Sequence, residues 1–501
     1  MTPGTSGASL ATLARACGDV LVQAPAEDVP VAGLAYDSRA VEAGHLFFCI
    51  PGTLSDGHAY AETAVAAGAV ALCVERPTGA GVPEIVVSDA RSAMARVAAE
   101  FYGRPGDELM LLGVTGTNGK TTTAFLIESI LSAAGRTTGL IGTIETRVAG
   151  RRKPGVRTTP ESLDLQRLLA EMRDAGVTAV AMEVTSHALV MQRVGSLHFE
   201  VAAFTNLSQD HLDFHSSMED YFAAKRMLFT PERANKGVAN LDDPSGVRVF
   251  DESTIPCVGF GSDERAQVRA VDVRSGPWGS EFVLEMATVG EIKISTSLVG
   301  HFNVSNCLAA AAAAWQAGIE PQAIQAGIEQ LGAVPGRFEA VDAGQPFTVV
   351  VDYAHTPDSL DNVLRGARAL AGTGRVVCAF GCGGDRDRGK RPLMGSVAAR
   401  LADFVIVTSD NPRSEDPHAI IDSILEGVTA ERPAGPDAVL ADRREAIRRA
   451  LSEARSGDVV VIAGKGHETG QEFRDHTIPF DDRDVARRGL AELGWPREDK
   501  A

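Results

Sequence analysis

Residues 113–123 read GVTGTNGKTTT, and this stretch decides the central fold of the chain. The apolar run at 109–114 predicts a buried strand, and the apolar-periodic run at 124–134 predicts a helix. A Gly-rich turn between a strand and a helix, closed by Lys120 and Thr121, is typical of a loop that holds a polyphosphate. We therefore expect a nucleotide-binding sheet around this segment.

The chemistry of this turn follows from its residue types. Glycines let backbone N–H groups turn toward phosphate oxygens, and the helix N-terminus adds its positive dipole end. Lys120 would reach the outer phosphates, and the hydroxyl of Thr121 would coordinate Mg²⁺. Val114 stands where the strict pattern G-x-x-x-x-G-K-[ST] has its first glycine, which separates the chain from ordinary P-loop GTPases. The alternative is a Gly-rich turn that binds no ligand.

Length and breaker clusters predict three domains. A chain of 501 residues is too long for one core. The sequence GRPG at 103–106 and the sequence VPG at 334–336 are candidate linkers. Strands alternate with helices between them, which predicts a parallel sheet covered on both faces. We expect an α/β protein with domains at 1–108, 109–335 and 336–501.

Composition narrows the class of partner and the compartment. The net charge of −18 predicts no nucleic-acid partner. The seven cysteines form no C-x-x-C pair, which fits free thiols in a reducing cytoplasm. The N-terminus has no signal-peptide pattern and no apolar run reaches about 18 residues, so we expect no membrane span. We also expect a monomer.

Two carboxylate-bearing segments follow predicted strands near the nucleotide loop. Glu183 ends one strand, and the sequence DHLD at 210–213 follows the next, so Glu183 is a candidate second carboxylate for Mg²⁺. His211 and His215 are four residues apart, and on a helix they could share a face and bind zinc instead. Solvated loop charge is the alternative for Glu183.

Three further polar residues lie on or just before predicted helices. Lys225 in the sequence YFAAKR reads from its residues alone as an exposed helical lysine. Asn303 and Asn306 precede an Ala-rich helix, where they could bind an adenine edge or serve as helix N-caps.

Four charged loops follow the predicted strands of the C-terminal third, at 352–357, 383–388, 410–413 and 464–468. The carboxyl ends of parallel strands meet at one sheet edge, where ligands bind. Arg386 and Arg413 could each grip a carboxylate with two parallel hydrogen bonds. We therefore predict a binding site at this edge.

Taken together, these segments resemble the Mur ligase family, ATP-dependent enzymes that build the peptide of bacterial cell-wall precursors. The resemblance runs through most of the chain, in the segments TGTNGKTTT, MEVTSHAL, TNLSQDHLDFH, YFAAKRMLF, GHFNVSNCLAA, PGRFE, DYAHTPDSL, GCGGDRDRGKRPLM, SDNPRSEDP and AGKGHE. Within the family the chain is most similar to the branch that adds the third residue of the peptide. The resemblance implies a smaller N-terminal α/β domain for the UDP-sugar, a central P-loop ATPase-type domain with a parallel sheet, and a C-terminal Rossmann-like domain for the amino acid.

The resemblance also implies roles for individual residues. ATP would be held by Gly116, Thr117, Asn118, Gly119, Lys120, Thr121, Thr122, Asn303, Arg337 and Asp352. The UDP-sugar-peptide would be held by Tyr36, Ser38, Thr158, Thr159, Thr185 and Arg193. Diaminopimelate would be held by Arg386, Asp410, Asn411, Pro412, Arg413, Gly464 and Glu468. The catalytic and metal-binding residues would be Lys120, Thr121, Glu183, His211 and Lys225, the last as a carbamate that supports a second Mg²⁺.

Two positions depart from the family pattern. Met191 stands where a relative has Gln, with Gln192 beside it, and Arg157 stands where Asn often precedes the two threonines.

The implied reaction joins meso-diaminopimelate to the D-glutamyl carboxylate of UDP-N-acetylmuramoyl-L-alanyl-D-glutamate through an acyl phosphate, with ATP as co-substrate. Three alternatives stay open: the same ligase adding L-lysine, a folylpolyglutamate-type ligase, and a nucleotide-dependent switch that ligates nothing.

Overall fold

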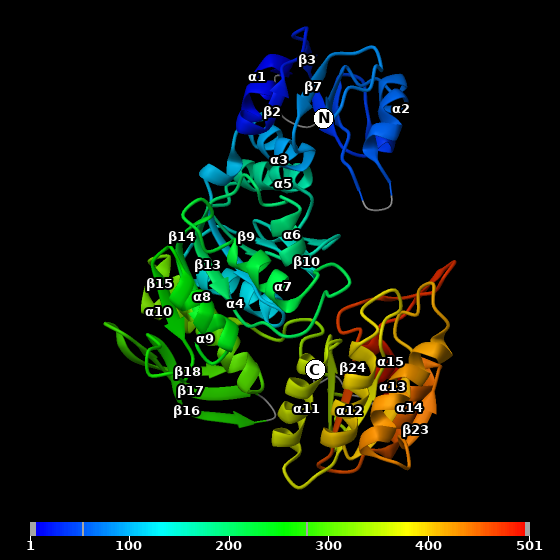
Figure 1. Ribbon diagram of the computed structural model, residues 1–501. Helices are drawn as coiled ribbons and strands as arrows, with labels where there is room; N and C mark the ends of the chain where they lie inside the picture. Colours follow the sequence, from blue (N-terminus) through cyan, green and yellow to red (C-terminus); the bar gives the residue numbers. More distant parts are fainter. Residues whose placement is uncertain (1–6, 53–54, 277–278, 496–501) are drawn as a thin grey trace.

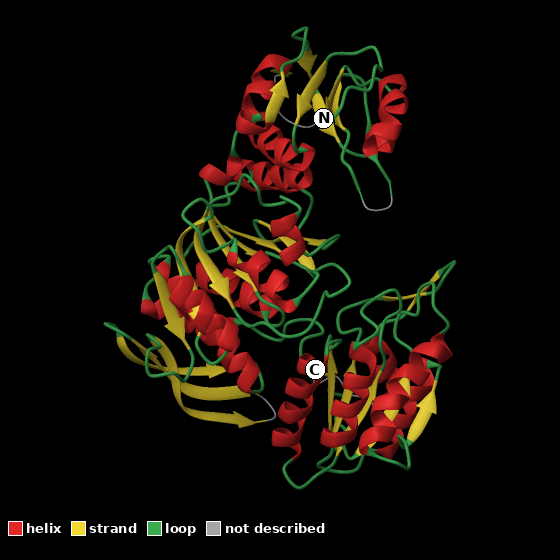
Figure 2. Cartoon of the chain, viewed as in Figure 1, coloured by secondary structure: helices red, strands yellow, loops and turns green. Residues whose placement is uncertain are grey.

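The computed structural model describes residues 7–52, 55–276 and 279–495. It contains three main sheets, which follow one another along the chain and form three lobes (Figures 1 and 2). In the described ranges, no helix combines the length and the apolar composition needed to cross a bilayer.

The N-terminal lobe is built on a five-stranded sheet of order β2-β7-β6-β5-β4, antiparallel only between β2 and β7. Its strands are β2 (Leu21–Gln23), β4 (Gly33–Ala35), β5 (His45–Phe48), β6 (Ala71–Val74) and β7 (Glu84–Val87). A short antiparallel pair lies beside it, β1 (Ala8–Ser9) with β3 (Pro30–Val31). Apolar residues of α1 (Leu10–Ala16) and α3 (Ala90–Phe101) pack on one face and those of α2 (Ala61–Ala66) on the other.

The central lobe is built on an eleven-stranded sheet of order β11-β10-β9-β12-β8-β13-β14-β15-β16-β17-β18. Its parallel centre consists of β8 (Met110–Thr115), β9 (Thr138–Ile141), β12 (Ala179–Glu183), β13 (Phe199–Phe204), β14 (Ala234–Asn240) and β15 (Cys257–Phe260). One edge is extended by antiparallel pairing of β10 (Glu145–Val148) and β11 (Arg151–Pro154). At the other edge β16 (Val268–Gly276) joins β15 in parallel, and β17 (Gly279–Met286) and β18 (Gly290–Thr296) follow antiparallel.

Helices cover both faces of the parallel centre. One core contains residues of α4 (Lys120–Ala133), α9 (His301–Gln316) and α10 (Pro321–Gln330). The core on the opposite face contains residues of α5 (Ser162–Asp174), α6 (Ser186–Val190), α7 (Met218–Arg226) and α8 (Pro244–Glu252). The prediction of a parallel sheet is therefore confirmed for the centre and incomplete at the edges. The edge strands β17 and β18 alternate between buried and more exposed residues, as expected for antiparallel strands covered on one face.

The C-terminal lobe is built on a six-stranded sheet of order β19-β20-β24-β21-β22-β23, parallel except for β19. Its strands are β19 (Glu339–Ala340), β20 (Thr348–Asp352), β21 (Val376–Phe380), β22 (Phe404–Thr408), β23 (Ala438–Leu440) and β24 (Val459–Ala463). A hairpin of β25 (Gly470–Glu472) and β26 (Thr477–Pro479) follows β24. One face packs against α11 (Pro357–Ala371), α12 (Lys390–Leu401) and α13 (Pro417–Glu431), the other against α14 (Arg443–Glu453) and α15 (Asp482–Glu492).

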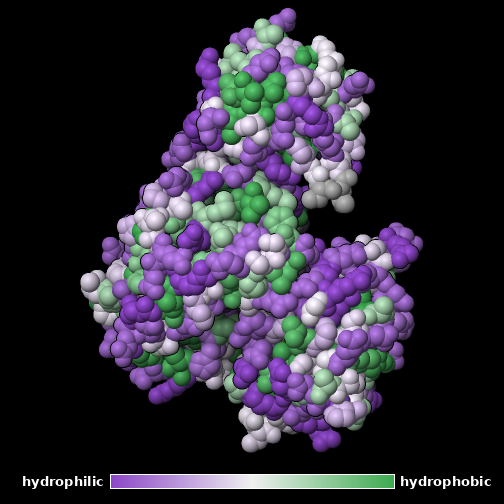
Figure 3. Space-filling view, viewed as in Figure 1, coloured by the Kyte–Doolittle hydropathy of each residue, from purple (hydrophilic) through white to green (hydrophobic). Residues whose placement is uncertain are grey.

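The strand of this sheet that comes last in sequence, β24, is inserted between β20 and β21. The strand order therefore changes direction in the middle of the sheet, and ligands of open parallel sheets bind beside such a position. The surface in Figure 3 is mostly hydrophilic and is hollowed between the N-terminal and C-terminal lobes. The α/β fold class with three domains is confirmed.

Candidate active site

The nucleotide loop joins β8, in the middle of the central sheet, to the N-terminus of α4. Helix α4 begins at Lys120, four residues before the predicted start, because Gly119 has φ +84 and ends the loop in a left-handed conformation. Gly116 has φ +149, and a Cβ there would lie 1.9 Å from Thr205 Oγ1. The loop therefore requires glycine at both positions.

Lys120 folds back over this loop, where its Nζ donates to the carbonyl oxygens of Gly116 at 2.9 Å and Thr117 at 2.8 Å. Burial lowers the pKa of Lys120, while the nearby carboxylates of Glu183 and Asp210 oppose that shift. The ammonium is thus held within the loop that would surround the phosphates.

Lys225 lies on α7 and is 1% exposed, so its interpretation as an exposed helical lysine is wrong. Its Nζ donates to the Gly116 carbonyl at 2.7 Å and lies 4.5 Å from the centre of the Tyr221 ring. Burial, reinforced by the charge of Lys120, places the pKa of Lys225 well below the usual lysine value. Lys225 therefore hydrogen-bonds the nucleotide loop but does not line the cavity described below.

Glu183 ends β12, the strand beside β8, and is 1% exposed, so it is not a solvated loop charge. Its carboxylate accepts hydrogen bonds from Thr121 Oγ1 at 3.0 Å, Thr143 N at 2.8 Å and Thr143 Oγ1 at 3.1 Å. Arg337 Nη2 donates to Thr121 Oγ1 at 3.0 Å. A carboxylate and a hydroxyl are therefore fixed side by side at the start of α4.

His211 adopts a left-handed conformation with φ +55 and packs edge to face against His187, with ring centres 4.9 Å apart. Burial lowers the pKa of His211 to about 3, so its imidazole is neutral at pH 7. His215 does not join it, since its Nε2 lies 2.9 Å from Ser186 Oγ. In the part of the chain that the structure describes, no three His, Cys, Asp or Glu side chains are grouped to hold a metal ion.

The threonines and the arginine predicted for the sugar-peptide gather at the end of β12. Thr159 Oγ1 donates to the Glu183 carbonyl at 2.8 Å, and Arg193 Nη1 donates to the Thr159 carbonyl at 3.2 Å. Glu161 is paired with Arg193 at 2.8 Å and with Arg157. Arg157, one of the two departures from the family pattern, lines the same cavity as Thr159 and Arg193.

The second departure from the family pattern is Met191, with Gln192 beside it. Gln192 Oε1 accepts a hydrogen bond from Arg233 Nη2 at 3.2 Å, and Met191 Sδ lies 3.7 Å from Arg193 Nη2. Neither Met191 nor Gln192 lines the cavity.

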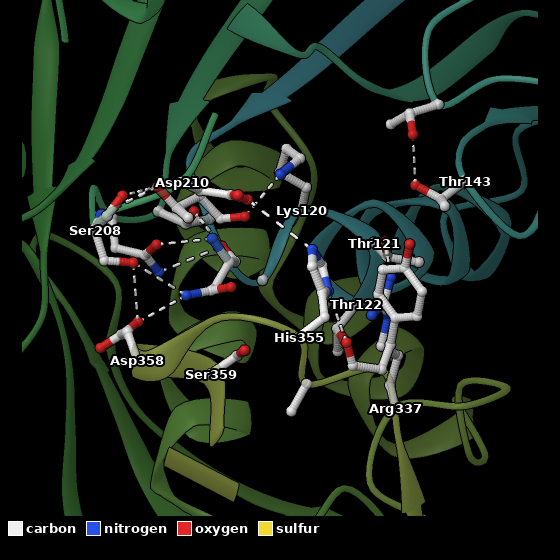
Figure 4. A pocket seen from close by; sticks show the side chains of 18 of the residues that line it. Lys120, Thr121, Thr122, Thr143, Ser208, Asp210, Arg337, His355, Asp358 and Ser359 are labelled. Carbon is white, nitrogen blue, oxygen red and sulfur yellow. Dashed lines mark hydrogen bonds and ion pairs between the residues drawn. The ribbon is translucent and has the colours of Figure 1, made fainter. Parts of the chain in front are cut away.

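The C-terminal lobe meets the nucleotide loop directly. Asn118 Nδ2 donates to Asp358 Oδ2 at 2.7 Å, and His355 lies beside Asp210, with Nε2 and Oδ2 4.0 Å apart (Figure 4). Arg337, just after the second predicted linker, bonds Thr121 as described above. The loop after β20 therefore contacts the nucleotide loop, and residues of the loops after β21, β22 and β24 line the same cavity as the nucleotide loop.

These loops also bond to one another. Arg413, with φ +52, donates through Nε to Glu472 Oε2 and through Nη1 to the Gly384 carbonyl, both at 2.8 Å. Asn411 Nδ2 donates to Glu468 Oε2 at 2.7 Å. Gly464 N also donates to the Asp352 carbonyl at 3.0 Å, so the predicted gathering of four charged loops is found.

One cavity of about 840 Å³ connects these groups. The predicted residues that line it are Thr117, Asn118, Gly119, Lys120, Thr121, Thr122, Thr158, Thr159, Glu183, Thr185, Arg193, His211, Arg337, Asp352, Arg386, Asp410, Asn411, Arg413, Gly464 and Glu468. The predicted residues that do not line it are Tyr36, Ser38, Gly116, Lys225, Asn303 and Pro412.

Two of these exclusions have clear causes. Asn303 is 2% exposed and donates to the Val299 carbonyl at 2.9 Å, whereas Asn306 lines the cavity. Both lie inside α9, whose N-cap is Gly300, so the helix-cap interpretation is wrong. Tyr36 lies in the N-terminal lobe, and its hydroxyl donates to Asp164 Oδ2 of α5, in the central lobe, at 2.6 Å.

Sequence reasoning missed several lining residues, among them Thr143, Asp358, Ser359 and Lys390. Asp358 and Ser359 directly follow the predicted 352–357 loop, and that position could have identified them. Thr143 follows β9 and carries no motif that could have indicated it.

Family models match three parts of the chain: "Mur ligase family, catalytic domain" at residues 30–102, "Mur ligase middle domain" at 114–314, and "Mur ligase, glutamate ligase domain" at 336–466. Two relatives carry the name UDP-N-acetylmuramoyl-L-alanyl-D-glutamate--2,6-diaminopimelate ligase. The one from Geobacillus kaustophilus is 50% identical over 93% of this chain and 96% of its own length. The one from Streptomyces avermitilis is 47% identical over 97% of this chain and 98% of its own length.

A solved structure with the same enzyme name superposes with a TM-score of 0.68 and 34% identity, covering 97% of this chain and 99% of the other. Matched along nearly its whole length in sequence and in fold, the chain belongs to the Mur ligase family.

Proposed function

We propose that this chain is an ATP-dependent ligase that joins meso-diaminopimelate to the D-glutamyl carboxylate of UDP-N-acetylmuramoyl-L-alanyl-D-glutamate, in the synthesis of peptidoglycan precursors. The names of its relatives support the two substrates. We assign the UDP-sugar to residues 1–108, ATP to 109–335 and the amino acid to 336–501. We also place the enzyme in the cytoplasm as a monomer, consistent with seven cysteines that are all free thiols.

The observation that carries the proposal is the composition of the cavity. It is lined by the nucleotide loop around Lys120, by the threonines beside Glu183, and by the arginine-bearing loops of the C-terminal lobe. A ligase of this kind must bring a phosphoryl donor, a carboxylate and an amine together, and each of these three walls offers groups for one of them.

In the first step the glutamyl carboxylate oxygen attacks the γ-phosphorus of ATP, the bond to the bridging oxygen breaks, and ADP leaves. Two anions approach each other here, so charge neutralisation is the main requirement. Lys120 and Arg337 both line the cavity beside Thr121 and supply positive charge from the central and C-terminal lobes.

The residues present also fit Mg²⁺, which prefers oxygen ligands and in nucleotide sites completes its shell with phosphates and water. Thr121 Oγ1 and the Glu183 carboxylate would hold one ion, and the neutral His211 imidazole with a Lys225 carbamate would hold a second. When bound, the ions would neutralise phosphate charge in the transition state.

Lys225 is suited to carbamate formation because CO₂ reacts with a neutral amine. Its lowered pKa favours the neutral form of Nζ compared with an ordinary lysine. The nitrogen lone pair adds to the carbon of CO₂, and one N–H proton is released to solvent. The product is an anion. An attraction between this carbamate and Lys120 would then replace the repulsion between the Lys120 and Lys225 amino groups.

In the second step the neutral amine of diaminopimelate attacks the acyl carbon, the nitrogen loses one proton to solvent, and the tetrahedral intermediate expels phosphate as the amide forms. Arg386 and Arg413 would bind carboxylates of diaminopimelate, and Glu468 would accept hydrogen bonds from its distal ammonium. The acyl phosphate must be shielded from water, which the contacts between Asn118 and Asp358 and between Arg337 and Thr121 favour.

The test is a substrate screen with the UDP-sugar dipeptide, ATP and a panel of amino acids, read by phosphate release and by the mass of the product. The proposal expects phosphate release that depends on both the UDP-sugar dipeptide and diaminopimelate. Equal use of L-lysine would instead identify a lysine-adding ligase. Hydrolysis that needs neither co-substrate would identify a nucleotide switch, and ligation of glutamate to folate would identify a folylpolyglutamate-type ligase.

A further inference from the structure

A buried lysine lies beneath the loops assigned to the amino acid. Lys465 follows the end of β24, and its side chain is 0% exposed. Its Nζ donates to Asn411 Oδ1 at 2.8 Å and to Glu468 Oε2 at 3.0 Å, and it lies 3.8 Å from Asp410 Oδ1. Lys465 does not line the cavity, whereas all three of its partners do.

This contact fixes the direction in which the Asn411 amide points. Asn411 Oδ1 accepts from Lys465 Nζ and from Glu472 N at 3.1 Å, so its Nδ2 is left to donate to Glu468 Oε2 at 2.7 Å. Because an amide has one acceptor side and one donor side, the Lys465 ammonium excludes the flipped orientation. It thereby also fixes one oxygen of Glu468 and leaves the other for a substrate.

The same ammonium balances the charge of this wall. Asp410 and Glu468 bring two carboxylates to the cavity, and Asp410 Oδ1 is buried without a hydrogen-bond partner in the described structure. The guanidinium of Arg443 is also near, but it is neutralised by Asp482 in a pair that is 0% exposed on both sides. Removing the charge of Lys465 would leave Asp410 and Glu468 facing the cavity without the ammonium that lies between them.

Charge balance decides which amino acid this wall favours. The distal end of diaminopimelate carries an ammonium and a carboxylate, with a net charge of zero, whereas the distal end of L-lysine carries only an ammonium. Without the Lys465 charge this wall would be more negative beside Asp410 and Glu468, which favours the lysine end and disfavours the distal carboxylate of diaminopimelate.

We propose that Lys465 is a positioning residue that sets the preference of this enzyme for a zwitterionic over a cationic amino-acid side chain, through the Asn411 amide and the Glu468 carboxylate. The inference rests on the proposed function, since it takes the loops after β22 and β24 as the amino-acid site. Lys465 touches no substrate in this scheme.

The experiment measures kcat/KM for diaminopimelate and for L-lysine at saturating ATP and UDP-sugar dipeptide. The variants are Lys465→Met, Lys465→Gln and Lys465→Arg, with Lys293→Met on the exposed edge strand β18 as a matched control. Lys465→Gln keeps an amide donor toward Asn411 and Glu468 while removing the charge, so it guards against loss of folding in Lys465→Met. Circular dichroism and the KM for ATP are recorded for each variant.

The proposal expects the diaminopimelate-to-lysine ratio of kcat/KM to fall by at least about tenfold in Lys465→Met and Lys465→Gln. It expects Lys465→Arg to keep that ratio within about threefold of the wild type, and the KM for ATP to stay within about twofold. Equal losses for both amino acids, with an unchanged ratio, would overturn the inference and leave a structural role. A wild-type enzyme that does not incorporate diaminopimelate would overturn the proposed function itself.

Discussion

Lys120 and Lys225 donate hydrogen bonds to the same acceptor, the carbonyl oxygen of Gly116, at 2.9 and 2.7 Å. Two ammonium groups on one carbonyl would repel each other in a buried site. Burial and the charge of Lys120 resolve this conflict by placing the pKa of Lys225 well below its usual value. The lowered pKa favours the neutral form of Lys225, and the neutral amine is the form that CO₂ can modify.

The first prediction concerns Lys225→Ala. We expect ligation to fall by at least about 10³-fold, because the variant removes a group that orders the nucleotide loop and would carry the carbamate. Added acetate or formate should restore part of the activity by supplying carboxylate oxygens in the space left by the side chain.

The measurement is the ligation rate with and without the added carboxylate, at matched ionic strength with chloride as the control anion. Full activity of Lys225→Ala would exclude a catalytic role for this lysine. An inactive variant that no carboxylate restores would count against the carbamate.

The second prediction concerns Lys120→Ala. Its Nζ contacts are two backbone carbonyls within the same loop, so the variant loses about 1 kcal/mol of stability per hydrogen bond and no core volume. Ligation should nevertheless fall by at least about 10³-fold, because the charge opposite the phosphates is gone.

Ligation rate and thermal unfolding are measured together, with Lys153→Ala on the exposed strand β11 as the control. Near-normal turnover of Lys120→Ala would show that residues 113–123 do not hold the reacting phosphates.

The third prediction concerns acid stability and His467, whose pKa burial lowers to about 3. In the unfolded chain a histidine titrates near pH 6.5, so the unfolded state binds more protons between about pH 6.5 and pH 3. The contribution of neutral His467 to stability is therefore complete above pH 6.5 and is lost as the pH falls through this window.

The variant His467→Phe should lose less stability on acidification, by up to about 1.4 kcal/mol per pH unit within this window. Denaturant unfolding of both proteins at pH 7.5, 6.0 and 5.0 measures the difference. Identical pH dependence of the two proteins would show that His467 does not titrate in this way. Its Nδ1 is buried without a hydrogen-bond partner in the described structure, which makes protonation there costly.

Much of the fold could be predicted from the sequence, since apolar runs bounded by glycine and polar residues mark buried parallel strands. The strand predicted at 109–114 is found as β8, at Met110–Thr115. The edge strands β10, β11 and β16–β18 escaped prediction because antiparallel strands with one exposed face carry a weaker apolar signal.

Site residues could be predicted where they directly follow a strand in the sequence. They could not be predicted where tertiary packing determines their burial and their partners. Glu183 and the four C-terminal loops stand at strand ends, and topology alone brings them together. The burial of Lys225 results from the packing of α7 behind a loop more than 100 residues earlier in the chain. Thr143 and Lys465 act through side-chain partners that no local pattern identifies.

The last prediction concerns the choice of amino acid, through Arg413. Its guanidinium lines the cavity and is held by Glu472 and by the Gly384 carbonyl, which leaves Nη2 for a substrate carboxylate. The backbone of Arg413 is in the left-handed region, with φ +52, which is costly for a non-glycine residue and is common at functional sites. Diaminopimelate offers a distal carboxylate to this guanidinium, and L-lysine does not.

We expect Arg413→Ala to raise the KM for diaminopimelate at least about 100-fold, because the variant loses the charge-assisted hydrogen bond to the distal carboxylate. The KM for ATP should stay within about twofold of the wild type, because, of the substrates, Arg413 contacts only the amino acid in this scheme. Arg487→Ala, on the exposed face of α15 in the same lobe, is the matched control. A site built around a polar substrate group can reject an analogue that lacks it by roughly 10⁴-fold, so the wild type should use L-lysine very poorly. If the wild type incorporated L-lysine as efficiently as diaminopimelate, the guanidinium of Arg413 would have no carboxylate to bind in the productive complex. Its strained backbone and its contact with Glu472 would then serve only to hold the loop.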